Sequence, residues 1–198
     1  MLYFRYHSTN CFFVKSSLNQ RLLAVDAGWP KTLYEYARNM KTIGCKLEEI
    51  AWAIVTHFHM DHAGLINDFL DRGVACFIFE NQVGAVDSME KTILKNDKTY
   101  KLIDKGKLQP LNTKDSKSAL AAIGIMGEVV VTDYHSTDSI SFILDDGEAI
   151  VGDLPPEGQR MPDDKEHIRN WELIRKMGAK TVYPSHAGVF KLEDGVHQ

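Results

Sequence analysis

The sequence predicts an α/β fold, because short apolar runs typical of strands alternate along the chain with segments of helical periodicity. A second observation is that its 198 residues, 44% hydrophobic and 25% charged, match the size and composition of one globular domain. A third is that the sequence contains neither internal repeats nor low-complexity tracts. We therefore expect one domain over residues 1–198, with enough apolar side chains to bury a sizeable core.

The first half of the chain is predicted to alternate strands with helices. In order, the elements are strands at residues 11–14 and 22–25, a helix at 31–43, a short helical turn at 47–50, a strand at 51–56, a helix at 63–70, a strand at 74–79 and a helix at 80–89. Each strand is uncharged, as expected for a buried strand, and residues 16–20 suit a hairpin turn between the first two. Gly44 and Gly73 mark two helix ends, because glycine readily adopts the left-handed conformation that closes a helix.

The second half is predicted to contain four strands and one long helix. The strands lie at residues 128–132, 139–144, 148–151 and 180–183, and the helix lies at 164–177. Asp145-Asp146-Gly147 suits a hairpin turn between two of the strands. We expect Asp163 to cap the helix N-terminus and Gly178 to follow its C-terminus. Pro184 lacks an amide hydrogen and ends the last strand.

Residues 90–117, which we call the lysine-rich segment, differ from the rest of the chain. They contain eight lysines and only four acidic residues. Two interpretations are open. The segment is either a lid that contacts an acidic substrate or a solvated connection between elements, the usual role of such charge runs.

The composition excludes several classes of protein. A formal net charge of −4 argues against a nucleic-acid-binding body. No apolar run approaches the roughly 20 residues of a spanning helix, and the first residues lack the pattern of a signal peptide. Cys11, Cys45 and Cys76 form no Cys-x-x-Cys pair, which favours buried reduced thiols and a cytoplasmic location. We expect a small-molecule substrate and no nucleic acid or membrane partner, and leave the oligomeric state open, a homodimer included.

The strongest signal for chemistry is the hexapeptide His57-Phe58-His59-Met60-Asp61-His62. Chance would produce three histidines and one aspartate in such an arrangement in roughly one in a thousand chains of this composition. Imidazole and carboxylate groups are ligands of zinc and similar divalent metals. In an extended segment, His57 and His59 lie on the same side and are able to hold one metal. Asp61 and His62 begin the next helix and are able to turn toward a second.

Three further candidate ligands follow three separate predicted strands. His135 follows the strand at 128–132, Asp153 follows the strand at 148–151, and His186 follows the strand at 180–183. Open α/β sheets bind ligands beyond the carboxyl ends of their strands. We therefore expect these side chains to converge with the hexapeptide.

These residues resemble the motifs of a known family. The resemblance rests on the hexapeptide, on residues 135–139, on Gly152-Asp153 and on Pro184-Ser185-His186. Together they resemble the metallo-β-lactamase fold superfamily of metal-dependent hydrolases, over nearly the whole chain. The resemblance implies a four-layer α-β-β-α sandwich, with the site along one edge of its two sheets.

The resemblance also implies a site with two divalent ions. The first ion would be held by His57, His59 and His135, the second by Asp61, His62 and His186, and Asp153 would bridge them. We expect zinc, with iron or manganese also compatible with this ligand set. Asp26 and Thr56 either orient ligand imidazoles or have ordinary turn and strand roles.

The implied function is hydrolysis by a dinuclear centre. A hydroxide bridging the ions would attack an ester, thioester, lactone or related bond. Asp61 is the candidate catalytic residue, to orient this nucleophile or to shuttle its proton. β-Lactam hydrolysis is disfavoured, because Asp153 stands where the β-lactamase branches typically have Cys or Ser. Two alternatives stay open: a mononuclear iron oxidoreductase similar to persulfide dioxygenases, and a non-catalytic metal-binding module.

Other residues carry weaker signals. His7, His167 and His197 have no partners in sequence, and we expect them to be incidental or at the surface. Trp29 follows a strand-end turn and is a candidate for the rim of the site. Tyr134 and Leu154 are adjacent to ligand positions and are candidates for lining the substrate pocket.

Overall fold

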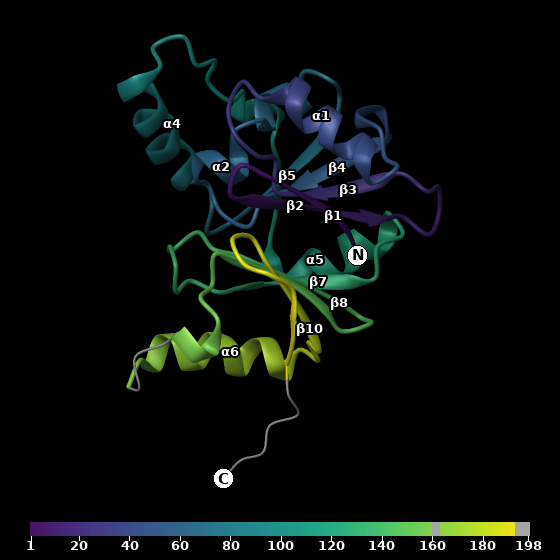
Figure 1. Ribbon diagram of the computed structural model, residues 1–198, viewed down its shortest axis with the longest axis vertical. Coiled ribbons are helices and arrows are strands. Elements are labelled where there is room, and N and C mark those ends of the chain that lie inside the picture. The colour runs from purple at the N-terminus through teal and green to yellow at the C-terminus, as the bar shows by residue number, and fades with distance from the viewer. Residues whose placement is uncertain (160–162, 193–198) are drawn as a thin grey trace.

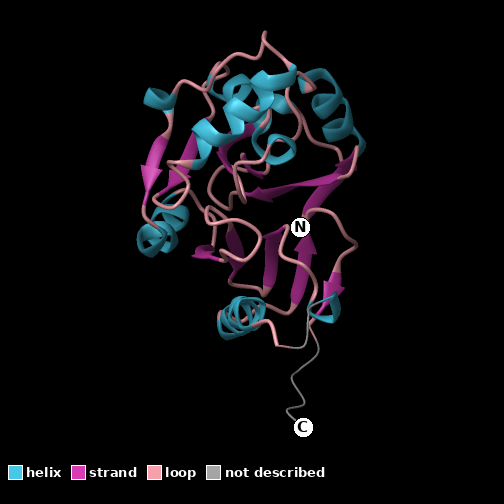
Figure 2. Cartoon of the chain, turned by 90° about the vertical axis from the view of Figure 1, so that its left-hand side faces the viewer, coloured by secondary structure: helices cyan, strands magenta, loops and turns pink. Residues whose placement is uncertain are grey.

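The apolar runs pair into two sheets that stack face to face, with helices on the outer faces, in this computed structural model (Figure 1). The structure describes residues 1–159 and 163–192. Helices α1 (Leu33–Thr42) and α4 (Ala85–Asn96) lie on the outer side of the first sheet, and α6 (Lys165–Lys176) covers the second. Figure 2 shows the same layers from the side. The expected α/β class and four-layer α-β-β-α sandwich are confirmed.

The first sheet has six strands in chain order. They are β1 (Leu2–Tyr6), β2 (Thr9–Lys15), β3 (Leu22–Val25), β4 (Ile50–Ile54), β5 (Ala75–Phe79) and β6 (Gln109–Leu111). The first three pair antiparallel, and β3 to β6 pair parallel. Val25 pairs with Ile54, so the chain leaves β3 and β4 at the same edge of the sheet.

The second sheet has the strand order β11-β10-β9-β8-β7. Its strands are β7 (Gly127–Val131), β8 (Ile140–Leu144), β9 (Glu148–Gly152), β10 (Thr181–Pro184) and β11 (Phe190–Lys191). Since β9 and β10 pair parallel, the residues that follow them emerge at one edge. The two sheets therefore bring several strand ends to a common edge of the sandwich.

The core is divided by the alternation of side chains along each strand. Phe12 and Leu23 pack between the sheets with Phe142 and Ile150, whereas Phe13 packs on the other side with the helices. Successive side chains of a strand point to opposite faces, and here both faces are covered. This double burial explains the uninterrupted apolar runs at residues 11–14 of β2 and throughout β3.

Most predicted elements are present, with shifted ends. The remaining helical elements are α2 (Met60–Ala63), α3 (Ile66–Leu70), α5 (Ser116–Ala122) and the 3-10 turns Leu47–Glu49, Lys105–Lys107, Thr113–Asp115 and Glu157–Gln159. The predicted ends at Gly44, Gly73 and Gly178 are confirmed, since all three glycines have positive φ angles. Four elements were not predicted from the sequence: β1, β6, β11 and α5. None of the helices in the described part of the chain has the length and apolar character needed to cross a bilayer.

The prediction of one continuous helix at 63–70 was wrong. The structure has two short helices, α2 and α3, because the amides of Gly64 and Leu65 donate to the carbonyls of Gly28 and Ala27. A Cβ at Gly64 would lie 2.2 Å from the backbone nitrogen of Pro30. Glycine therefore permits this close approach, which attaches the helices to the end of β3.

Two helix starts were also predicted wrongly. The helix predicted at 80–89 begins instead at Ala85, because Gln82 turns inward: its side-chain amide donates to the carbonyl of Val55 and accepts from the amide of Phe79. The N-cap of α6 is Asp164 rather than Asp163, since Asp164 Oδ1 accepts from the amide of His167 at 3.1 Å.

The lysine-rich segment is held by exposed ion pairs to its own surroundings. Lys101 contacts Asp71 at 2.6 Å and Lys117 contacts Glu128 at 3.2 Å. Lys105 pairs with Asp87. These contacts favour the interpretation of the segment as a solvated connection.

The packing between the sheets predicts a large effect for Phe142→Ala. Phe142 is buried between the sheets, and removing a buried Phe side chain costs about 3–5 kcal/mol. Urea unfolding should show this loss. The control Tyr34→Ala removes a side chain that is 84% exposed and should change the free energy of unfolding by less than about 0.5 kcal/mol. Equal stabilities of the two variants would contradict this assignment of the core.

Candidate metal centre

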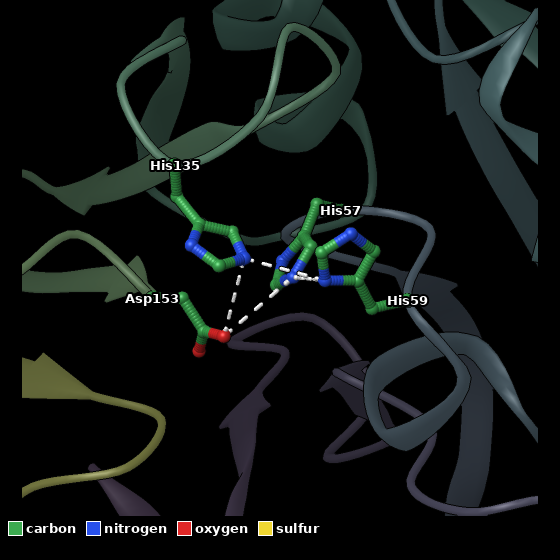
Figure 3. A group of neighbouring side chains, drawn as sticks. All are labelled: His57, His59, His135 and Asp153. Atoms are coloured by element: carbon green, nitrogen blue, oxygen red, sulfur yellow. Dashed lines mark hydrogen bonds and ion pairs between the residues drawn. The ribbon is translucent and has the colours of Figure 1, made fainter.

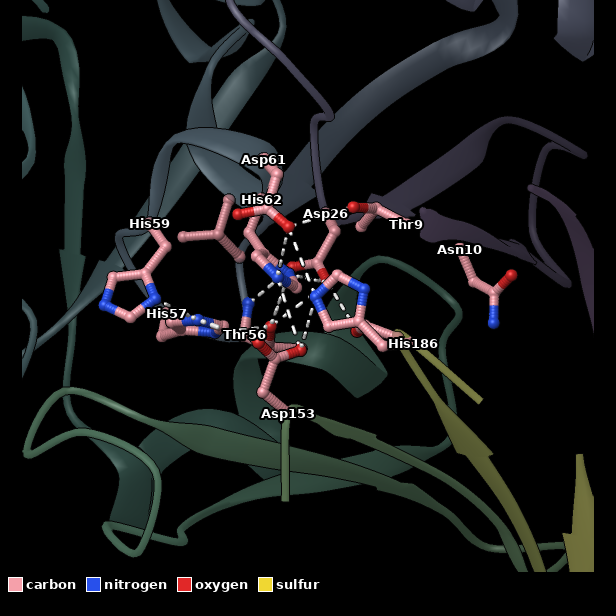
Figure 4. Close-up of polar contacts among 12 residues, drawn as sticks. Thr9, Asn10, Asp26, Thr56, His57, His59, Asp61, His62, Asp153 and His186 are labelled. Carbon is pink, nitrogen blue, oxygen red and sulfur yellow. Dashed lines mark hydrogen bonds and ion pairs between the residues drawn. The ribbon is translucent and has the colours of Figure 1, made fainter. Parts of the chain in front are cut away.

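Seven side chains from four segments meet at one edge of the sandwich (Figures 3 and 4). The hexapeptide follows β4 and contributes four of them. Residues that follow β7, β9 and β10 contribute the other three: His135, Asp153 and His186. The structure thus brings together every residue that the sequence predicted as a ligand, while their binding of metal stays a prediction.

The first group combines three imidazoles with one carboxylate oxygen (Figure 3). His59 Nδ1 lies 3.0 Å from His57 Nε2 and 3.2 Å from His135 Nε2. Asp153 Oδ2 lies 3.7 Å from His57 Nε2 and 3.5 Å from His135 Nε2. Four potential ligand atoms therefore surround one point.

The second group has similar dimensions. Asp61 Oδ2 lies 3.3 Å from His62 Nε2 and 3.2 Å from His186 Nε2. The other oxygen of Asp153, Oδ1, lies 3.3 Å from His62 Nε2 and 3.2 Å from His186 Nε2. Asp153 therefore faces one group with each of its two oxygens.

These distances fit a divalent ion at each group. Ligand atoms about 2.0–2.1 Å from a tetrahedral zinc ion are ~3.3 Å from one another, and the contacts above range from 3.0 to 3.7 Å. Two of the atoms, His62 Nε2 and Asp153 Oδ1, are buried and have no hydrogen-bond partner among the described residues. Buried polar atoms normally have partners, and a cation between them would satisfy both.

Asp26 and Thr56 hold the imidazoles from behind. His62 Nδ1 donates to Asp26 Oδ2 at 2.8 Å, which leaves the Nε2 lone pair directed at the centre. Thr56 Oγ1 lies 3.0 Å from Asp26 Oδ1 and 3.2 Å from His57 Nδ1. Of the two roles predicted for Asp26 and Thr56, the structure favours the orientation of candidate ligands.

Several residues that hold the site in place were not predicted from the sequence. Thr9 donates to Asp61 Oδ2 at 2.9 Å, and the side-chain amide of Asn10 donates to the carbonyls of Pro184 at 2.8 Å and Ala187 at 3.1 Å. Asp138 Oδ2 accepts from the amide of Phe58 at 2.6 Å. Thr9 and Asn10 are polar residues at the start of a strand, and nothing in the sequence connects them with His186.

Without a metal, the ionisation states of the two groups differ. Burial and the neighbouring His62 lower the pKa of His57 to about 2, so its imidazole is neutral. Burial on its own would raise the pKa of Asp153, but the contacts with His186 and His62 outweigh it and hold the pKa well below its usual range. Asp61 behaves in the same way. Neutral imidazoles and ionised carboxylates are the forms that bind cations.

In the second group, burial on its own would lower the pKa of His62, but Asp26, Asp153 and Asp61 outweigh it and raise that pKa, and contacts with Asp153 and Asp61 raise the pKa of His186 to about 10. A cation bound at the second group would therefore displace a proton from each of these imidazoles.

An open pocket of about 620 Å³ lies beside the centre. Both apolar and polar residues form its walls. The lining residues are Trp29, Phe58, His59, Met60, Asp61, Asn81, Gly84, Ala85, Ser88, Met89, Thr92, Thr137 and Asp138. The predicted place of Trp29 at the site is confirmed. Tyr134 and Leu154 do not line this pocket: Tyr134 donates to Asp164 at 2.5 Å, and Leu154 packs in the core against α6.

The other histidines differ in their surroundings. His7 is half exposed and lies 3.3 Å from Glu35, as expected for a surface residue. His167 is not at the surface, because its side chain is buried and its Nε2 donates to the carbonyl of Pro155 at 2.7 Å, and it belongs to neither candidate ligand group. His197 lies outside the described residues.

Comparisons of the sequence identify related proteins. The family model of the metallo-beta-lactamase superfamily matches residues 5–186. The Beta-lactamase-like protein 2 homolog of Caenorhabditis elegans is 25% identical over 190 residues, which are 94% of this chain and 58% of that protein. The chain therefore spans little more than half the length of this curated relative.

Solved structures share the fold. TTHA1429 of Thermus thermophilus, a metallo-beta-lactamase family protein, is 18% identical, with a TM-score of 0.66 over 92% of this chain and 70% of the other. TTHA1623, solved in a di-iron-bound form, is 14% identical, with a TM-score of 0.66 over 92% and 89%. FIM-1 of Pseudomonas aeruginosa, solved in a mono-zinc form, is 17% identical, with a TM-score of 0.61 over 92% and 78%.

The contacts of Asn10 predict that Asn10→Ala loosens the segment around His186. The substitution leaves the buried carbonyl of Pro184 without its side-chain donor and should lower the free energy of unfolding by about 1–3 kcal/mol. Urea unfolding measures this loss, and hydrogen exchange should show faster exchange at residues 185–187. The control Asn112→Ala removes an exposed contact to Asp115 and should be nearly neutral. Unchanged exchange at residues 185–187 would count against this role of Asn10.

Proposed function

Because the chain belongs to the metallo-β-lactamase superfamily, we propose that it is a metal-dependent hydrolase with a dinuclear centre. The observation that carries the proposal is the orientation of Asp153. One of its oxygens lies 3.7 Å from His57 Nε2 and 3.5 Å from His135 Nε2, and the other lies 3.3 Å from His62 Nε2 and 3.2 Å from His186 Nε2. A carboxylate so placed suits a bridge between two ions.

Each group supplies the ligand types of zinc, and iron or manganese also bind such nitrogen and oxygen ligands. His57, His59 and His135 would hold the first ion with Asp153, and Asp61, His62 and His186 would hold the second. Two bound ions would lower the pKa of a bound water and polarise the oxygen of the bond under attack.

One side chain of the site is placed to transfer the proton that hydrolysis moves. In hydrolysis of an ester, thioester or lactone, the water oxygen bonds to the carbonyl carbon, and the bond to the leaving oxygen or sulfur breaks. The contacts of the Asp61 side chain with Thr9, His62 and His186 all use Oδ2. Its Oδ1 therefore takes the proton of the water and passes it to the leaving group.

The partner and location of the protein are also proposals. The pocket beside the centre has a volume typical of small-molecule sites, which supports a small-molecule substrate. All three cysteines are free and buried. Free thiols suit a reducing compartment, and we propose the cytoplasm.

The function predicts that His59→Ala and Asp153→Ala abolish turnover. The protein should first be loaded with metal, quantified, and tested against thioesters, lactones, phosphodiesters and β-lactams. Because each variant removes a candidate ligand, kcat/KM for the best substrate should fall to the background rate. The control Glu172→Ala changes an exposed carboxylate on α6 and should keep full activity.

The same preparation separates the alternatives. One iron per chain, with oxidation of a sulfur substrate, would support the mononuclear oxidoreductase. Bound metal without turnover of any substrate class would support the non-catalytic module. Full activity of His59→Ala or Asp153→Ala would contradict the assignment of the site.

A further inference from the structure

The pocket beside the centre is placed to receive a part of any molecule bound there. His59 belongs to the first ligand group and Asp61 to the second, and both side chains line the pocket. A bond held between the two groups therefore has one of its substituents directed into this space. The pocket volume of about 620 Å³ falls within the usual range for small-molecule sites.

Four large apolar side chains form part of the pocket wall. Trp29, Phe58, Met60 and Met89 all line the pocket. Phe58 and Met89 are only 3% and 4% exposed, so the core holds them in place. Such walls favour an alkyl or aryl group, since burial of apolar surface drives its binding and methionine adapts to its shape.

The charges around the pocket have one sign. Apart from His59, the ionisable residues that line it are Asp61 and Asp138, and no lysine or arginine is among them. Asp138 already accepts from the amide of Phe58. In the proposed enzyme the charge of Asp61 is offset by a metal ion, so Asp138 is the uncompensated carboxylate of the wall. A negatively charged substituent deep in the pocket would lose hydration without gaining a lysine or arginine of the wall as partner, which is costly. Asn81, Ser88 and Thr92 offer only neutral polar contacts.

Two lysines near the pocket are already paired with carboxylates. Lys31, which follows the turn of Trp29, pairs with Asp97. Lys105 pairs with Asp87, an acidic residue in the first turn of α4. Their charges are compensated by carboxylates outside the pocket wall.

We propose that the pocket selects substrates with an uncharged apolar acyl group, an inference that rests on the hydrolase function proposed above. The substrate class is an ester, thioester or lactone whose acyl group is a neutral alkyl or aryl chain of several carbons. Acyl groups that end in a carboxylate or phosphate are disfavoured.

Three matched esters test the proposal: 4-nitrophenyl acetate, 4-nitrophenyl hexanoate and the 4-nitrophenyl monoester of adipic acid. The last two have acyl chains of equal length and differ by a terminal carboxylate. We expect kcat/KM to rise by up to about fourfold for each methylene that becomes buried. The hexanoate should therefore exceed the acetate at least tenfold, and it should exceed the adipate by a similar factor.

A charge introduced into the wall provides the matched variant. Ser88 is exposed on α4 and lines the pocket. Ser88→Lys should narrow the preference for hexanoate over adipate by about fivefold, the effect of one partly exposed ion pair. Ser118→Lys makes the same change of charge on α5, away from the pocket, and should leave the preference unchanged.

Binding to metal-free protein supplies a readout that does not depend on turnover. Hexananilide and the monoanilide of adipic acid are titrated against tryptophan fluorescence, since Trp29 lines the pocket. The neutral anilide should bind at least tenfold more tightly, and Trp29→Ala should remove most of the signal. Equal binding of both anilides, or equal hydrolysis of hexanoate and adipate, would overturn the pocket assignment while the hydrolase proposal survives. Tight neutral binding without hydrolysis of any ester would refute the hydrolase proposal instead.

Discussion

The candidate site depends on one carboxylate that joins the two sheets. Asp153 follows β9 in the second sheet, and it reaches His57 and His62, which follow β4 in the first. The two groups can share it only while the sheets keep their relative position. Phe142 and Ile150, packed between the sheets, maintain that position. The geometry of the site therefore depends on the packing of the core, since a shift of one sheet would move Asp153 away from one group.

A second carboxylate is buried at the same edge, and hydrogen bonds from three segments stabilise it. Asp26 is fully buried, and it accepts hydrogen bonds from His62, Thr56 and Ser185, which belong to three different segments. A buried carboxylate without partners would be strongly destabilising. These bonds let the end of β3 carry a negative charge that orients His62 and adds to the attraction for cations.

The features that could be predicted from the sequence are those that local patterns of residues determine, such as strands and the clustered candidate ligands. The strand at 22–25 has the predicted ends, because double burial makes it uncharged throughout. β1 was missed because Arg5 and an exposed Tyr3 interrupt its apolar pattern at an edge. The candidate ligands were found because histidine is concentrated in the hexapeptide and because the other three residues follow strands. Residues such as Asn10 could not be found, since their partners lie more than 170 positions away in sequence.

A crystal structure of the metal-loaded protein, with anomalous diffraction recorded at the absorption edge of the bound metal, tests the central claim most directly. The account predicts two anomalous peaks, one among His57, His59 and His135 and the other among Asp61, His62 and His186, with one oxygen of Asp153 bound to each. A single peak, or both oxygens of Asp153 bound to the same ion, would contradict it.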